Sequence, residues 1–140
     1  MPRFPRSGAG RTIFLLGTLA LSMGIIGLAQ PHAQLQRIGY DLPADDAVIT
    51  VMPLMTIMSL ATINTALIYM FGSWIDWPGL PALLVVTRLV MGSGLLLLAL
   101  LGRAPEAFFA AAVWEAVGAM LIAGARVRDM RCAVGGGRRA

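Results

Sequence analysis

Four long apolar segments, separated by short polar stretches, dominate the pattern of hydrophobic and polar positions along the chain. They cover residues 12–29, 50–73, 80–102 and 106–125. A helix rises about 1.5 Å per residue, so about 20 apolar residues in a helix cross the hydrocarbon layer of a membrane. The pattern therefore predicts an all-α fold in the form of a four-transmembrane-helix bundle.

Both ends of the chain are basic and rich in Gly or Pro. Residues 1–11 and 127–140 are therefore expected to be disordered. This expectation leaves residues 12–126 as a single membrane domain that contains all four spans.

The longest polar stretch inside this domain is residues 30–46. It predicts a solvated loop in which Asp45 or Asp46 caps the following helix. The uncharged run after this loop is longer than one crossing requires. Because Pro is best tolerated in the first turn of a helix, Pro53 predicts an interfacial turn over residues 44–52 before the span.

Small residues recur along the first apolar segment at helical spacing, at Gly17, Ala20, Gly24 and Gly27. Such a seam favours close packing against another helix. The alternative is a cleaved signal peptide, because a basic start, an apolar run and a possible cleavage site at residues 27–29 follow one another. The apolar run is longer than signal peptides usually have, which favours a retained span.

The distribution of Arg along the chain predicts the orientation of the bundle. Three Arg precede the first span and five follow the last, whereas the two loops at the opposite end hold only Arg37 and Arg103. The positive-inside rule therefore places both termini in the cytoplasm. Tyr69, Trp74 and Trp77 are expected to be interface anchors, because amphipathic rings favour the membrane boundary.

Composition supports the membrane class. Charged residues make up 13% of the chain, against about 25% in a typical soluble domain. All eleven basic residues are Arg, and a chain that lacks Lys and is rich in Arg, Ala and Gly suggests a high-GC bacterial genome. With four predicted spans, the expected location is then the bacterial inner (plasma) membrane. The Arg residues cluster at the two ends of the chain, beside apolar segments. They do not form a basic face with aromatic residues between them, so nucleic acid is not expected as a partner.

Two ionisable residues, Arg88 and Glu115, lie inside the third and fourth apolar segments. A central charge costs about 2.5–3.5 kcal/mol on insertion, and each large aliphatic residue or Phe offsets about 0.3–0.6 kcal/mol. The third segment is apolar enough to carry Arg88, but the fourth is marginal for Glu115. Arg88 shares a helix face with Gly92, and Glu115 with Gly118, as expected for sides that face a bundle.

Depth in the membrane suggests neighbours for this pair. Counted from the cytoplasmic ends, Asn64 and Arg88 lie about 12 Å deep, and Ser22 and Glu115 about 15 Å deep. The sequence therefore predicts a buried polar cluster of Ser22, Asn64, Arg88 and Glu115. In the alternative, Arg88 extends toward the headgroups and does not pair with Glu115.

Residues for catalysis or metal binding are sparse. The chain has one His and one Cys, and it has neither a Ser/His/Asp set nor a phosphate-binding loop. His32 with the nearby Asp41, Asp45 and Asp46 is better explained as a solvated loop than as a metal site. No enzymatic activity, metal or cofactor is therefore predicted.

Residues 88–124 resemble part of the DoxX-like small bacterial membrane proteins, which have four helices. The resemblance is carried by Arg88–Gly92 (RLVMG) and Trp114–Gly124 (WEAVGAMLIAG). In that family the pair lies in the first two helices, and here it lies in the third and fourth. The resemblance implies a link to quinone-dependent redox complexes, with which some members of that family are associated. The chain is also similar to small multidrug transporters, but only in its architecture of four spans in a short chain.

These observations predict a small multi-pass membrane protein of structural or accessory type, with a buried polar cluster. The expected partners are the lipid bilayer and a second copy of the chain or a larger membrane complex. The alternative is a binding or transport module for a small apolar or protonatable molecule, which would use Glu115.

Overall fold

The computed structural model describes residues 5–39 and 46–136, and within them every regular element is a helix. The five helices are α1 (Gly8–Ala29), α2 (Pro31–Arg37), α3 (Asp46–Trp74), α4 (Leu80–Leu100) and α5 (Ala107–Gly136). All but α2 contain a stretch that is long and apolar enough to cross a membrane. These stretches are Gly8–Ala29, Val51–Trp74, Leu80–Leu100 and Ala107–Ala133.

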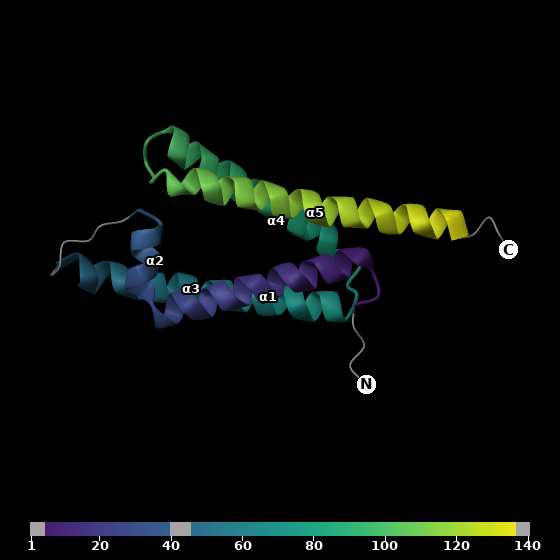
Figure 1. Ribbon diagram of the computed structural model, residues 1–140, viewed down its shortest axis with the longest axis horizontal. Coiled ribbons are helices and arrows are strands. Elements are labelled where there is room, and N and C mark those ends of the chain that lie inside the picture. Colours follow the sequence, from purple (N-terminus) through teal and green to yellow (C-terminus); the bar gives the residue numbers. More distant parts are fainter. Residues whose placement is uncertain (1–4, 40–45, 137–140) are drawn as a thin grey trace.

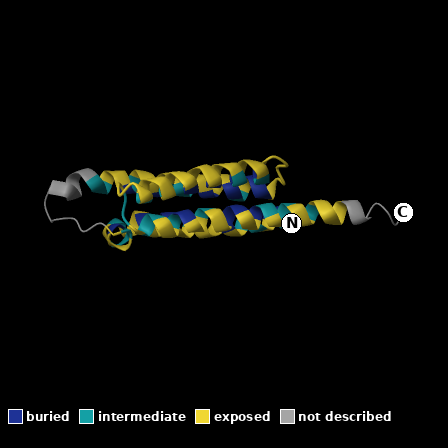
Figure 2. Cartoon of the chain, turned by 90° about the horizontal axis from the view of Figure 1, so that it is seen from above, coloured by how far each residue is buried: buried dark blue, intermediate teal, exposed yellow. Residues whose placement is uncertain are grey.

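The four long helices form two antiparallel hairpins, α1 with α3 and α4 with α5 (Figure 1). The hairpins meet mainly where α1 contacts α5. Figure 2 shows that the buried positions lie on the sides of the helices that face one another. The outer sides carry large apolar residues with high exposure, such as Leu15, Phe71, Val90 and Leu100. This pattern is the one expected of helices that face lipid.

The first hairpin packs closely because glycines of α1 lie directly against α3. A Cβ atom on Gly24 would lie 2.7 Å from Cγ1 of Ile63, and a Cβ atom on Gly17 would lie 3.0 Å from Cβ of Tyr69. Neither position leaves room for a larger side chain without a shift of α3. The prediction that Gly17 and Gly24 belong to a packing seam is therefore confirmed.

A small apolar core joins both hairpins at the end of the molecule where α1 and α4 begin. All four long helices contribute to it, with Ile13, Leu16, Tyr69, Leu80, Leu84 and Ile122. Leu80 is the first residue of α4 and lies close to Gly72, where an added Cβ atom would be 2.8 Å from its Cδ2. Burial of these side chains is the main apolar contact that holds one hairpin on the other.

The ends of the chain are more helical than the sequence suggested. α5 continues to Gly136, so the predicted disordered tail is wrong for residues 127–136. α1 already begins at Gly8, inside the stretch 1–11 that was expected to be disordered. Hydrogen bonds between Asp129 and the first turn of α1, described below, join these two parts of the chain. Residues 1–4 and 137–140 lie outside the described part of the chain.

The predicted loop 30–46 and the turn before α3 also differ from expectation. The loop contains α2, which begins at Pro31, a residue suited to the first position of a helix. α3 runs without interruption from Asp46 through Pro53, so no separate interfacial turn precedes it. Asp41 and Asp45 lie outside the described residues.

Candidate functional site

Arg88 and Glu115 form an ion pair between α4 and α5. Nη1 of Arg88 donates a hydrogen bond of 3.1 Å to Oε2 of Glu115. The side chain of Arg88 is 6% exposed and that of Glu115 is 21% exposed. Arg88 therefore points into the bundle and not outward along the helix. A charge-assisted contact of this kind is among the stronger hydrogen bonds in proteins.

Two glycines make room for this pair. A Cβ atom on Gly118 would lie 2.5 Å from Nη1 and 2.9 Å from Cζ of Arg88, so the guanidinium rests on the backbone of α5. A Cβ atom on Gly92 would lie 3.2 Å from Cβ of Glu115. The prediction that these glycines share bundle-facing sides with the two charges is confirmed.

Tyr69 of α3 extends the site to the first hairpin. Cζ of Arg88 lies 5.7 Å from the centre of the Tyr69 ring, within the range of a cation–π interaction. Tyr69 is only 9% exposed, so the expectation that it is an interface anchor is wrong. Nε of Arg88 is buried without a hydrogen-bond acceptor, so the aromatic ring is the contact that offsets part of its desolvation.

Ser22 and Asn64 do not join this pair. Both side chains are exposed, and Oγ of Ser22 donates to the carbonyl oxygen of Thr18 at 3.0 Å in its own helix. Asn64 lies two residues before the buried Ala66, which places it about 200° away around the helix axis. Equal depth therefore did not make these four residues neighbours, because depth does not determine the direction in which a helix faces.

The sequence signal that could have identified Tyr69 as part of the site is the helical repeat of small residues on the buried face of α3. That face carries small residues at helical spacing together with the ring, namely Ser59, Ala66, Tyr69 and Ser73. The more visible polar residues of α3 point elsewhere. Hydroxyls of Thr62 and Thr65 donate to carbonyl oxygens one turn earlier, at Met58 and Ala61. These hydroxyl groups are hydrogen-bonded within α3 itself, so they do not mark a functional site.

Trp74 and Trp77 lie at the end of α3 and in the turn that follows it. Both indole rings are about half exposed. Both therefore lie between two predicted spans, as expected of interface anchors. Their role at a membrane boundary stays a prediction.

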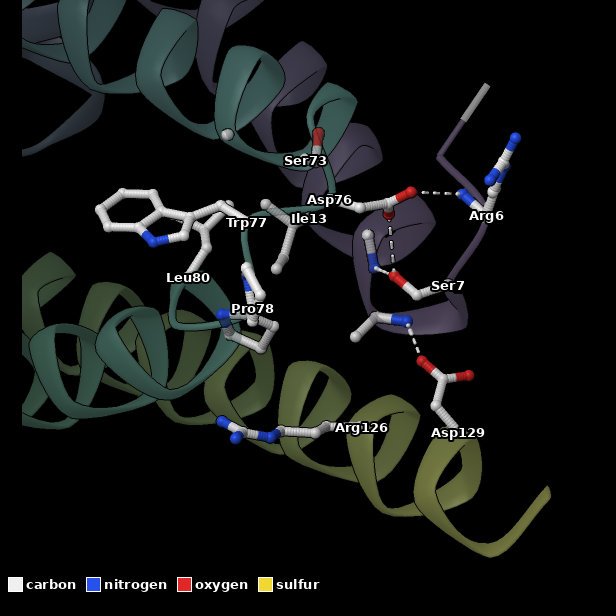
Figure 3. Close-up of a pocket in the computed structure, with 14 residues that line it drawn as sticks. Arg6, Ser7, Ile13, Ser73, Asp76, Trp77, Pro78, Leu80, Arg126 and Asp129 are labelled. Atoms are coloured by element: carbon white, nitrogen blue, oxygen red, sulfur yellow. Dashed lines mark hydrogen bonds between the residues drawn. The ribbon is translucent and has the colours of Figure 1, made fainter. Parts of the chain in front are cut away.

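A second polar cluster, which the sequence did not predict, surrounds the start of α1 (Figure 3). The carboxylate of Asp129 accepts hydrogen bonds from the backbone N–H of Gly8 at 3.0 Å and of Ala9 at 2.8 Å. Asp76 accepts from the hydroxyl of Ser7 and the backbone N–H of Arg6, each at 3.3 Å. Carboxylates are favourable here because a helix start carries unpaired N–H groups and a partial positive charge.

Within residues 5–39 and 46–136, no group of three or more His, Cys, Asp or Glu side chains is placed to hold a metal ion. No family model, curated protein or solved structure matches the chain. The resemblance to DoxX-like proteins stays a prediction.

Proposed function

We propose that this chain is a small multi-pass integral membrane protein of structural or accessory type. In this proposal the ion pair of Arg88 and Glu115 holds α4 on α5, and Tyr69 connects that hairpin to the first one. The observation that carries the proposal is the 3.1 Å contact between a nearly buried guanidinium and a carboxylate inside an apolar helix pair. The proposed location is a bacterial inner membrane.

The energetic argument concerns insertion of α5. Glu115 lies in a segment with few large apolar residues, and a lone charge at its depth costs about 2.5–3.5 kcal/mol. A partner on the preceding helix lowers this cost, because the pair has no net charge and the turn between α4 and α5 is short. The hairpin is then the unit that inserts, with its two charges already matched.

The orientation proposed for the bundle has both termini in the cytoplasm. Its support is the excess of Arg at the two ends together with the contacts of Asp129 with Gly8 and Ala9. These contacts hold the start of α1 and the last turns of α5 at the same end of the molecule. The partners proposed are the lipid bilayer and further membrane subunits or copies of the chain.

Substitution of the charged pair tests this function. Arg88→Gln and Glu115→Gln each leave one charge without a partner, and each is expected to lower the free energy of unfolding in detergent by about 3–5 kcal/mol. The double variant Arg88→Met/Glu115→Leu leaves no charge unpaired and is expected to recover most of this loss. Glu106→Gln, at an exposed position before α5, is the matched control.

The alternative proposal is a binding or transport module. It draws on the partial exposure of Glu115, whose side chain stays 21% exposed while it is bonded to Arg88. If Glu115→Gln is as stable as the parent but abolishes pH-dependent uptake of a hydrophobic amine into vesicles, the structural role is refuted and the transport role is supported. Full stability of every variant without any change in uptake would overturn both proposals.

A further inference from the structure

The outer side of α3 carries a polar group that the fold leaves without a partner, the amide of Asn64. Its side chain is exposed, and it lies about 200° around the helix axis from the buried Ala66. No hydrogen bond joins this amide to any residue that the structure describes. The amide therefore projects away from the bundle with its donors and its acceptor unused.

The depth of Asn64 makes this unused amide unfavourable. The apolar stretch of α3 covers Val51–Trp74, and Asn64 lies about 15 Å before its end at Trp74. The hydrocarbon layer of a membrane is about 30 Å thick, so this position is close to its centre. Lipid tails and the centre of the bilayer offer no hydrogen bond, and an unpaired amide there is costly.

Other exposed polar groups on the four long helices do not have this problem. The hydroxyls of Thr18, Ser22, Thr65 and Ser93 each donate to a carbonyl oxygen about one turn earlier in their own helix. They need no partner outside the chain. The amide of Asn64 has two N–H donors and a carbonyl acceptor, and α3 uses none of them. Its position indicates a contact with a group on another molecule.

The surface around Asn64 suits close contact with another helix. Leu60 and Ile68, one turn to either side, are apolar and about half exposed. Ala61 and Thr65 are also exposed and lie beside Asn64 at a spacing of four residues. Small residues at this spacing let two membrane helices approach closely. Close approach is required here, because the side chain of Asn is short.

We propose that this face of α3, made of Leu60, Ala61, Asn64, Thr65 and Ile68, joins two copies of the chain into a parallel dimer. In this dimer the two Asn64 amides form hydrogen bonds with each other across the two-fold axis. Hydrogen bonds of this kind join helices inside membranes.

The argument for a second copy is that the amide is complementary to itself. Two copies with the same orientation hold every residue at equal depth, so a residue on a two-fold axis normal to the membrane meets its own counterpart. The carbonyl oxygen of each amide can then accept from an N–H of the other. The inference rests on the membrane insertion and orientation stated under the proposed function, and it adds the face through which two copies associate.

The test measures association of the full chain in lipid vesicles, by energy transfer between dyes attached to the exposed Cys132. The parent is expected to dimerise. Asn64→Leu keeps the size of the side chain and removes the amide, and it is expected to raise the dissociation constant of the dimer about tenfold. Asn64→Gln keeps an amide and is expected to retain most of the association. Ser93→Ala, which removes an exposed hydroxyl bonded within α4, is the matched control and is expected to change nothing.

Cysteine cross-linking locates the contact between the copies. In a Cys132→Ser background, Ile68→Cys is expected to give disulfide-linked dimers with a membrane-permeant oxidant. Val86→Cys is the control, because Val86 is exposed on α4 and lies about 9 Å from the cytoplasmic end of its helix, the same depth as Ile68 in α3. It is expected to give no cross-link.

Each contrary result has a separate meaning. Unchanged association of Asn64→Leu, or equal cross-linking through Val86→Cys, would overturn the proposed face. A parent that stays monomeric at high density in the vesicles, or an Ile68→Cys variant that cross-links to a different protein in native membranes, would overturn the second copy as the occupant. Only folded protein recovered from membranes enters the test, so these results leave the proposed function intact.

Discussion

At the scale of single residues, the position of Arg88 depends on the absence of a side chain at Gly118. The guanidinium rests on the backbone of α5, where a Cβ atom would come within 2.5 Å of Nη1. Its contacts with Glu115 and with the ring of Tyr69 both follow from this position. A buried charge destabilises the folded state unless such partners remain in contact with it.

Gly118→Ala is therefore expected to displace the guanidinium and to lower the free energy of unfolding by about 1–3 kcal/mol, the usual cost of overpacking. Gly124→Ala is the control on the same helix, because a Cβ atom there would meet nothing within 4 Å. It is expected to be neutral or to stabilise by up to about 1 kcal/mol, since Ala is the better helix former. Thermal unfolding in detergent measures both, and equal effects would contradict the contact described for Gly118.

At the scale of elements, the last turns of α5 and the start of α1 stabilise each other. Asp129 accepts two backbone hydrogen bonds from α1, whose own N-cap, Ser7, accepts another at 2.9 Å from the backbone N–H of Gly10. The composition of the tail indicated disorder because Arg and Gly are frequent there. The carboxylate of Asp129 gives α5 a specific partner within this tail, at residue 129.

Asp129→Ala removes both bonds and is expected to cost about 0.5–2 kcal/mol, as loss of an N-terminal cap does. Hydrogen exchange of the backbone amides of Gly8 and Ala9 measures the change directly and is expected to accelerate. Arg128→Ala, which alters the neighbouring exposed residue, is expected to leave these amides unaffected. Unchanged exchange in Asp129→Ala would contradict the capping role.

At the scale of the whole molecule, the two hairpins are held together near one end. The apolar core, the contact of Arg88 with Tyr69 and the cap formed by Asp129 all connect the hairpins. Ile13 and Leu16 of α1 belong to that core. Loss of the first segment would remove both residues from the core.

The single cysteine tests the orientation of the whole bundle. Cys132 is exposed near the end of α5 and is expected to be cytoplasmic. A membrane-impermeant maleimide should therefore label it in inverted membrane vesicles and not in intact cells. In the variant Cys132→Ser/Glu106→Cys the label is expected from the outside only, because Glu106 lies in the turn between α4 and α5 at the opposite end. The reverse pattern would refute the proposed topology.

The sequence by itself determined the all-α class, the four apolar segments, the packing glycines of α1 and the two charges within α4 and α5. These properties are local, because the length of an apolar segment and the spacing of its small residues are both set within one helix. Only the tertiary structure decided the partners of those charges. In the structure the neighbour of Arg88 on α3 is Tyr69, and neither Ser22 nor Asn64 contacts the pair. The structure also places Asp129 where it caps α1. Such choices depend on the rotation of each helix about its axis, which is determined by packing against its neighbours and not by residue spacing alone.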